Sequence, residues 1–532
     1  MSDKMTQNEF SQMLRTFLPG DKFREVTMLL KKGNLELLLD KTYREWLNRQ
    51  SYMMSNVGQD NDSHVKEKIA AIIEKLVQCV EPTISGEGGW DREKMMKYQT
   101  QSSAVMLICQ VLLSALFCDD SQKETGSGVT LDSTCRKCIM KKVSCCLVTL
   151  CAAHTTSQLW TSTTSKTAAY ELLSLICTHC QCSSIPELLC GCVEVESGVL
   201  TEENKFEDSR TFNRVFPLGL FRHVLDYLRP QLLKDTWKKS PLACHVLVWC
   251  TMQVKHPYIG EHFFKLMSPL LLLIDDYEME SKTLGFKCLK HVVDNMNSAE
   301  LQWYGRADVL FEAAQRHVYT SDPFLVRVLH PCLLSILTVV EPSPQKSKFG
   351  RKTTKCDSVF QIILSSMEFE SKIAMRRAYA SHLKDFIEHM GITILRHFKR
   401  LLRVLVSFLE VSDYPDEETR LNILDSLNAA MLQAWPRIPN HSSTILKCLL
   451  KLLVDVTDSS AHLTTGAYQQ LKSKTAECLL TLLRCCGKVV EDQLKELKGV
   501  GHKEVEACAE KVLKANNRET GVPVSLQENE IT

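Results

Sequence analysis

Glycine is scarce in this chain, and neither sign of charge dominates. Only 21 of its 532 residues are glycine, against a usual share of about 7%, which disfavours Gly-rich phosphate-binding loops and tight hairpin turns. The chain has 64 basic and 63 acidic residues, so it lacks the strongly basic domain that nucleic-acid binders usually carry. We therefore expect no nucleic-acid partner.

The chain also lacks a long hydrophobic run. The longest is AVMLICQVLLSALFC, at residues 104–118, which is shorter than the about 18 residues that a spanning helix needs and is better interpreted as a buried helix. The opening residues, MSDKMTQNEF, are polar and contain no apolar signal core. These features predict no membrane segment and a cytoplasmic location, with the nucleus left open as a second compartment.

The familiar catalytic motifs are missing as well. The chain contains no phosphate-binding P-loop, no GxGxxG fingerprint, no HExxH and no GxSxG. None of its 16 histidines lies with a carboxylate and a nucleophile in a recognisable order. We therefore expect neither an enzyme nor a bound cofactor.

Cysteine, in contrast, is frequent. The chain has 23 cysteines, and without a secretory signal a disulfide framework is not expected. Two CxxC pairs raise a zinc-site hypothesis, one formed by Cys135 and Cys138 and the other by Cys177 and Cys180. Neither pair lies in a Gly-containing knuckle, and the first is followed by cysteines spaced among apolar residues as on a helix. Packing in a helical core is the favoured interpretation, and zinc is the alternative.

Apolar residues recur at three and four positions along nearly every ordered segment, and sustained two-residue alternation is absent, so the chain is expected to be all-α. Two acidic-aromatic pairs, Asp276–Tyr277 and Asp413–Tyr414, lie 137 residues apart, which is about three HEAT repeats of 40–47 residues. Each pair is followed by a helix pattern with a basic residue near its start, Lys282 and Arg420. The matched apolar positions of the two patterns are Phe286 with Leu424, Leu289 with Leu427 and Val293 with Met431.

These patterns predict a HEAT-like or armadillo-type α-solenoid of stacked antiparallel helix pairs. The acidic residues of each turn are expected to cap the helix that follows. We expect an irregular helical region at 1–200, repeats at 201–340, a flexible basic loop at 341–356, further repeats at 357–515 and a disordered tail at 516–532. Four tryptophans are expected to fill gaps between helices, although any of them could instead anchor a partner: Trp237, Trp249, Trp303 and Trp435.

The segment GITILRHFKRLLRVL, residues 391–405, gathers positive charge. At 100° per residue, Arg396, Lys399, Arg400 and Arg403 share one arc of a single amphipathic helix whose other face is apolar. One interpretation is a solvated face paired with the acidic residues that follow, namely Asp413, Asp416, Glu417 and Glu418. The other is a docking stripe for an acidic or phosphorylated segment of a partner.

Several stretches together resemble a known family. They are DTWKKSPLACHVLVW from Asp235, LIDDYEMESKTLGFKCLKHVV from Leu273, the segment from Met375 to Val411, and AWPRIP from Ala434. In order and spacing they resemble the TELO-two-interacting protein two (Tti-two) family, most clearly between Asp235 and Asp455.

The resemblance implies a non-catalytic subunit of the TTT co-chaperone complex. Its expected partners are the TELO-two protein and that protein's first interacting protein. Indirect partners would be the ninety-kilodalton heat-shock chaperone and the phosphatidylinositol-three-kinase-related kinases, including mTOR, ATM and ATR, whose folding, assembly and stability the complex supports. The alternative is another HEAT-repeat adaptor, of the nuclear-transport or phosphatase-scaffold type.

Overall fold

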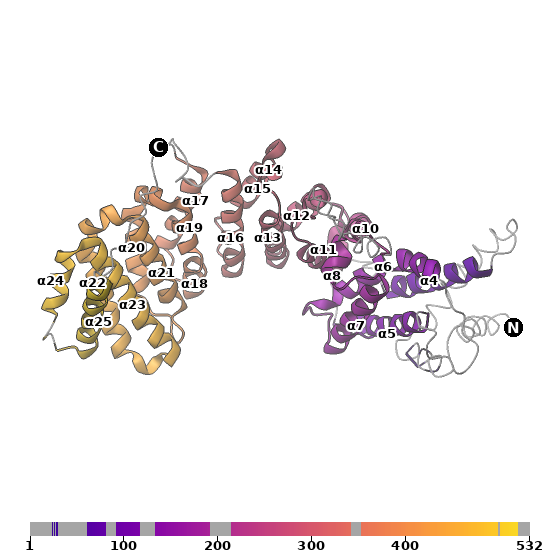
Figure 1. The fold of residues 1–532 in the computed structure, drawn as a ribbon, viewed down its shortest axis with the longest axis horizontal. Coiled ribbons are helices and arrows are strands. Elements are labelled where there is room, and N and C mark those ends of the chain that lie inside the picture. Colours follow the sequence, from indigo (N-terminus) through magenta and orange to yellow (C-terminus); the bar gives the residue numbers. More distant parts are fainter. Residues whose placement is uncertain are drawn as a thin grey trace, which may run out of the picture. The chain divides into compact units, whose positions relative to one another are not determined.

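The computed structural model describes residues 61–80, 92–116, 133–191, 214–341, 353–497 and 501–519, together with residues 24, 26, 28, 29 and 499. Every regular element in these ranges is an α-helix or a short 3-10 helix, and no strand occurs within them. The predicted all-α fold of stacked helix pairs, of the HEAT or armadillo type, is confirmed (Figure 1).

The chain divides into two compact units, residues 1–269 and 270–532, and the boundary falls inside α12 (Phe263–Ile274). The described α-helices of the first unit are α4 (Asn61–Val80), α5 (Arg92–Leu116), α6 (Ser133–Thr155), α7 (Thr163–His179), α8 (Ile185–Cys190), α10 (Phe221–Leu228) and α11 (Pro241–Gln253). Those of the second unit are α13 (Met279–Asp294), α14 (Ser298–Gln302), α15 (Arg306–Gln315), α16 (Pro323–Val340), α17 (Lys355–Glu368), α18 (Ile373–Ala380), α19 (Leu383–Met390), α20 (Phe398–Leu409), α21 (Glu418–Gln433), α22 (Ser442–Asp458), α23 (Thr465–Cys486), α24 (Lys488–Glu496) and α25 (Lys503–Glu519).

In the second unit the helices form two layers. The first helices of successive pairs, α17, α20 and α22, contact one another in that order. The second helices, α13, α16, α18 with α19, α21 and α23, form the other layer in the same way. Figure 1 shows these helices side by side along the second unit. Stacking of this kind buries the apolar face that an isolated helix pair would expose.

Local sequence explains several helix starts. Asp322 precedes α16 and accepts a hydrogen bond from the backbone N–H of Leu325, and Pro323 occupies the first helical position, where its missing N–H is not needed. Thr354 and Asp357 form a reciprocal capping box at the start of α17. These caps satisfy backbone donors that have no partner inside the helix.

The predicted repeat match is confirmed by the core. All six apolar residues matched between the two repeat patterns are buried: Phe286, Leu289, Val293, Leu424, Leu427 and Met431. Gly285 lies where α13 approaches the end of α12, because a Cβ atom there would lie 3.0 Å from Leu273 Cβ and 3.1 Å from the Ile274 backbone. A larger residue at this position would push the two helices apart.

Two described stretches are long and apolar enough to cross a membrane by length and composition alone, Lys137–Thr155 of α6 and Pro323–Val340 of α16. In the fold, 78% of the first stretch and 50% of the second is buried. Helix α6 packs against α4, α7 and α11, and α16 packs against α13, α15 and α18. Core helices of a helical stack meet the same length and composition criterion.

The two compact units of the chain meet at residues 269 and 270. The predicted regions, with divisions at 200 and 340, stay predictions. Helix α16 contacts α18 and α19, on the far side of the predicted loop at 341–356, because stacking of second helices continues across it. Residues 342–352 of that loop lie outside the described residues. In the predicted tail, α25 continues to Glu519, and residues 520–532 lie outside the described residues.

Candidate partner-binding surface

The basic segment at residues 391–405 is divided into two pieces. Gly391–Arg396 forms the 3-10 helix η9, His397 follows it, and α20 begins at Phe398. The β-branched residues 392–394 favour α-helix weakly, and Gly391 has a φ of 54°, outside the α-helical range. The prediction of one continuous helix was therefore wrong, and the four basic side chains do not project from a single helix.

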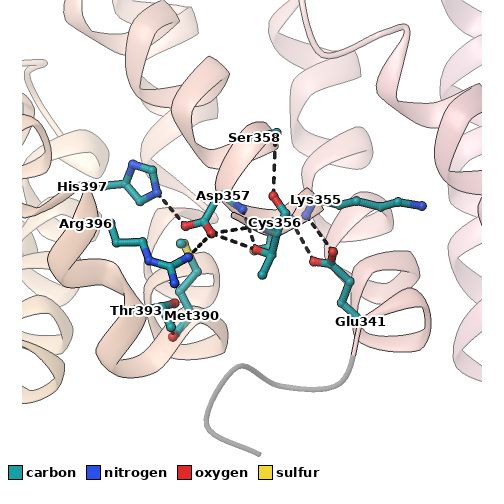
Figure 2. A network of polar contacts seen from close by, with 10 residues as sticks. Glu341, Lys355, Cys356, Asp357, Ser358, Met390, Thr393, Arg396 and His397 are labelled. Carbon is teal, nitrogen blue, oxygen red and sulfur yellow. Dashed lines mark hydrogen bonds and ion pairs between the residues drawn. The ribbon is translucent and has the colours of Figure 1, made fainter. Parts of the chain in front are cut away.

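At this break, the side chains of Arg396 and His397 both contact the buried carboxylate of Asp357 on α17 (Figure 2). Arg396 Nη1 lies 2.5 Å from Asp357 Oδ2, and His397 Nε2 lies 2.8 Å from Oδ1. The backbone N–H and the hydroxyl of Thr354 donate to Oδ2 at 2.9 and 3.1 Å. Asp357 thus caps its own helix and also holds the start of α20 against it.

These contacts change the acidity of Asp357. Burial by itself raises the pKa of this carboxyl, because a charged group loses hydration. The hydrogen bonds from Thr354 and His397 and the charge of Arg396 outweigh burial, so the pKa of Asp357 is lowered below its usual value. Asp357 is therefore an ionised anchor at neutral pH, and its carboxylate is already shared among several donors.

A second carboxylate completes the start of α17. Glu341, at the end of the preceding helix pair, accepts hydrogen bonds from the backbone N–H groups of Lys355 at 2.7 Å and Cys356 at 3.1 Å. The ammonium of Lys355 lies 2.5 Å from Asp308 on α15. Figure 2 shows Glu341 and Asp357 on opposite sides of the first turn of α17. Negative groups at a helix N-terminus are favourable, so this network joins neighbouring repeats.

Two further charges of the segment pair with the other end of α17. Arg400 Nε donates to Glu368 Oε2 at 2.9 Å, and Arg403 Nη1 lies 3.4 Å from Glu368 Oε1. The Arg403 side chain is 66% exposed. Lys399 is also exposed, and within the described ranges no carboxylate lies within 4.0 Å of its ammonium.

The predicted partners of the basic segment were therefore wrong. Its arginines do not pair with the acidic residues after α20 but with Asp357 and Glu368, on the helix before it. The physical reason is the stacking of α17 on α20, which brings their sides together. Only Lys399 and Arg403 keep a largely exposed charge that a partner could meet.

The acidic turn before α21 forms a separate buried network. Asp413 Oδ2 accepts hydrogen bonds from the backbone N–H and hydroxyl of Thr419, at 3.1 and 2.9 Å, so this residue caps α21 as predicted. Arg377 on α18 donates to the same oxygen at 2.6 Å and to the Asp413 carbonyl at 2.6 Å. The pair joins one repeat to the next, and the hydrogen bond to Asp413 raises the pKa of Arg377.

Arg420 and Glu417 lie beneath that turn. The guanidinium of Arg420 is buried and donates to the Leu409 carbonyl at 2.9 Å and to Asp455 at 2.5 Å. Glu417 Oε2 lies 3.6 Å from Arg420, and the hydroxyl of Ser412 donates to its other oxygen. Burial raises the pKa of Glu417. Arg420 thus joins α21 to α20 in its own helix pair and to α22 in the next pair.

The earlier acidic turn makes different contacts. Asp276 is buried and accepts a hydrogen bond from the backbone N–H of Tyr277 at 2.8 Å. Helix α13 begins after Glu278, whose side chain makes no capping hydrogen bond. Lys282 is half-buried. The two turns are equivalent in position, but Asp413 accepts from the first turn of the following helix, whereas Asp276 accepts from the backbone of the turn itself.

The CxxC cysteines occupy different environments. Cys138 is exposed on α6, whereas Cys177 and Cys180 are buried, and burial raises the pKa of both thiols to about 12. Zinc binds the charged thiolate form of cysteine, and burial of these two side chains disfavours that form. Cys135 lies on α6, but its side chain is outside the described residues. Among the described residues, no group of three or more His, Cys, Asp or Glu could hold a metal.

The tryptophan prediction is right for one residue and wrong for two. Trp237 is buried and Trp249 is half-buried. Trp303 and Trp435 are each 61% exposed, because they lie in short 3-10 segments between helix pairs and not on a packed face. These two rings are available for contact with a partner.

Sequence reasoning missed Asp357 and Glu368, the carboxylates that hold the basic segment. A local signal existed for Asp357, since Thr354 and Asp357 have the spacing of a capping box before an apolar helix. No local signal existed for Glu368, whose arginine partners lie more than 30 residues away in the chain.

Comparison with known proteins gives one family match. The model of the Tti2 family matches residues 147–415. Among curated relatives, TELO2-interacting protein 2 of Mus musculus is 39% identical over 345 residues, which are 65% of this chain and 63% of the relative. TELO2-interacting protein 2 of Homo sapiens is 35% identical over 333 residues, or 62% of this chain and 61% of the relative. The match thus spans less than two thirds of the length of these relatives.

Among solved structures, the chain is similar in fold to Kap95 and Kap121p. The Kap95:Nup1 complex gives a TM-score of 0.45 with 12% identity, covering 97% of this chain and 69% of the other. Kap121p bound to Pho4p gives 0.44 with 14% identity, covering 89% of this chain and 46% of the other.

Proposed function

Because the chain belongs to the Tti2 family, we propose that it is a non-catalytic scaffold subunit of the TTT co-chaperone complex. The observation that carries this proposal is the family match over residues 147–415, together with relatives whose name, TELO2-interacting protein 2, states a binding partner. By this proposal the chain binds the TELO2 protein and its first interacting protein.

The stacked repeats support a binding role. Helix pairs stacked in this manner present long surfaces made of many repeats, and such surfaces suit the binding of another extended protein. Ion pairs between adjacent repeats, such as Arg377 with Asp413 and Arg396 with Asp357, hold neighbouring pairs in register. A scaffold needs this rigidity to keep a large contact surface in one shape.

The finer part of the proposal concerns what the assembly does. With the ninety-kilodalton heat-shock chaperone, it would support the folding, assembly and stability of phosphatidylinositol-three-kinase-related kinases such as mTOR, ATM and ATR. This chain would act in the cytoplasm, with the nucleus as a second location, and fluorescence microscopy of the tagged chain tests that placement.

Affinity purification of the tagged full chain from cells tests the proposal. We expect the TELO2 protein and its first interacting protein in stoichiometric amounts, and depletion of the chain should lower the steady-state levels of the kinases. Recovery of the chain alone contradicts the proposal. Recovery of a Ran-type GTPase or a phosphatase catalytic subunit in their place would identify a different HEAT-repeat adaptor.

We also propose that the exposed part of the basic segment meets an acidic segment of a partner. The test is the double variant Lys399→Glu, Arg403→Glu, which leaves the contact between Arg396 and the buried Asp357 in place. A matched control is Lys447→Glu, Lys488→Glu, which makes the same change of charge at exposed positions on α22 and α24. We expect only the first variant to lose binding of the partner. Equal retention of the partner by both variants would indicate that Lys399 and Arg403 form a solvated face.

A further inference from the structure

One edge of the second unit carries an exposed aromatic ring in four successive repeats. Tyr277, Phe324, Phe369 and Tyr414 are 72%, 75%, 85% and 40% exposed. Single exposed apolar residues are common on protein surfaces, but these four are separated by 47, 45 and 45 residues, which is the repeat period. We call these four positions, with the turns that hold them, the turn edge.

Each ring follows an acidic residue at the turn between the two helices of a pair. Sequence reasoning identified only the outer two, Asp276–Tyr277 and Asp413–Tyr414. The inner two turns have the same character, as Glu368 directly precedes Phe369 and Asp322 lies two residues before Phe324. Each ring lies within four residues of the first residue of a second helix, which is the start of α13, α16, α18 or α21.

The four turns lie along one edge because the second helices stack in one direction. Helices α13, α16, α18 and α21 contact one another in that order, and Figure 1 shows them side by side. Two ion pairs connect these helices to the start of α21. Arg377 on α18 reaches Asp413 in the turn before α21, and Arg327 on α16 lies 2.8 Å from Glu418 at the first position of α21.

The turn edge is acidic although the chain as a whole is neutral. The segments 275–280, 316–324, 368–373 and 410–418 contain twelve acidic and two basic residues. Some of these carboxylates are paired with arginine or lysine, including Glu368, Glu410 and Glu418. Others are exposed, and within the described residues no cation lies within 4.0 Å of the carboxylate of Glu278, Glu280 or Asp416.

We propose that the turn edge is a docking site for a positively charged, extended segment of a partner protein. The aromatic rings would bury apolar side chains of that segment, and the carboxylates between them would meet its lysines and arginines. Aromatic residues surrounded by complementary charge are typical of the strongly contributing positions of protein interfaces. A partner with acidic character would be repelled by the same surface.

The repeat geometry sets the length of the segment. Packed helices lie about 8–10 Å apart, so four successive rings extend over about 25–30 Å. An extended chain advances about 3.3 Å per residue, so about nine residues cover the distance. The segment should therefore place an apolar side chain at about every third residue, with basic residues between.

Photo-crosslinking of the full chain in cells tests this inference, which rests on the proposed function for the existence of a partner. A benzoylphenylalanine replaces Phe324 or Phe369 at the turn edge. In matched controls it replaces Trp303 or Trp435, which are similarly exposed but lie at the connections between pairs. The crosslinked peptides are identified by mass spectrometry, and co-purifying proteins are measured in the same sample.

We expect the turn-edge positions to crosslink to one partner segment with a net positive charge, and the controls not to reach that segment. The double variant Phe324→Ser, Phe369→Ser should weaken retention of the same partner about tenfold or more. Because both rings are exposed, the variant should keep its helical circular dichroism spectrum.

Three results would overturn the inference: no crosslink from the turn edge, crosslinks only to acidic or uncharged segments, or full retention of the partner by the double variant. Recovery of both expected TTT subunits without a turn-edge crosslink defeats the inference alone. A crosslink to a basic segment of some other protein, with neither subunit recovered, supports the inference and defeats the proposed function. Recovery of no partner defeats both.

Discussion

Removal of the Asp357 carboxylate should open the contact between α17 and α20. In the variant Asp357→Ala, Arg396 and His397 lose their shared acceptor, and the backbone N–H of Thr354 loses the carboxylate that accepts from it. The matched control is Glu368→Ala, which removes a carboxylate with two arginine partners from the other end of the same helix.

The two losses differ because the two carboxylates differ in burial. The Asp357 side chain is 5% exposed, whereas that of Glu368 is 23% exposed and one of its arginines is 66% exposed. Breaking a buried ion pair on one side costs about 3–5 kcal/mol, and losing the hydrogen bond from the Thr354 backbone N–H costs about 1 kcal/mol. Since Arg396 is partly hydrated, we expect about 3 kcal/mol for Asp357→Ala. For Glu368→Ala we expect about 0.5–1 kcal/mol.

Hydrogen exchange is the suitable assay, because a chain with two compact units need not unfold in one step. Local opening is read from the protection of the backbone amides of α17 and α20. With about 1.4 kcal/mol per factor of ten, Asp357→Ala should lower protection about 150-fold and Glu368→Ala about two- to fivefold. Asp357→Asn, which keeps the shape of the side chain, should fall between them.

Equal losses of amide protection in the two alanine variants would refute the interpretation that Asp357 is the main contact holding α20 against α17. It would also be refuted if protection in Asp357→Ala fell only in the first turn of α17, since the carboxylate would then be a local cap without a role between repeats. Protection of α23 and α25, far along the stack, serves as the internal reference and should not change.

Three further measurements follow from the same structure, and the third uses the charge-reversal variant of Lys399 and Arg403. The pKa of Asp357 is lowered in the folded state. The ionised carboxylate therefore contributes stability above its unfolded pKa of about 4, and this stability is lost as the pH falls below that value. At pH 3 the amides of α17 should lose protection in the natural chain, whereas in Asp357→Asn they should lose no further protection. Iodoacetamide at pH 7.5 should label exposed Cys138 and leave Cys177 unlabelled, because burial raises the Cys177 pKa to about 12; equal labelling would contradict the buried thiol. Lys399→Glu with Arg403→Glu should leave hydrogen exchange in α20 nearly unchanged, and a large loss of protection would show that these charges stabilise the fold.

The positions that the repeat pattern matched are the best-predicted part of the chain. Phe286 and Leu424, 138 residues apart, are both buried at the same place in their repeats. Such positions are predictable because the apolar period of a helix depends only on the neighbours in the sequence. The cap by Asp413 was predictable for the same reason, since a side chain and the helix it caps are adjacent in the chain.

The candidate site was predictable only in part. The charge of the basic segment is visible in the sequence, but its partners are not, since Asp357 and Glu368 come from an earlier helix. The break at His397 was also missed, because helical periodicity continues through a 3-10 turn that long-range contacts stabilise. The rings Phe324 and Phe369 were overlooked because each is an ordinary residue until its turn is placed beside the others.

The amino-acid sequence by itself therefore determined the helical class of this protein, its repeat period and which face of many helices is buried, since all three depend on local spacing and on the transfer of apolar side chains from water. Only the tertiary structure decided which charges neutralise one another and which remain exposed. The difference arises because an ion pair requires two side chains within a few ångströms, and stacking brings together residues that the chain separates by 30 residues or more.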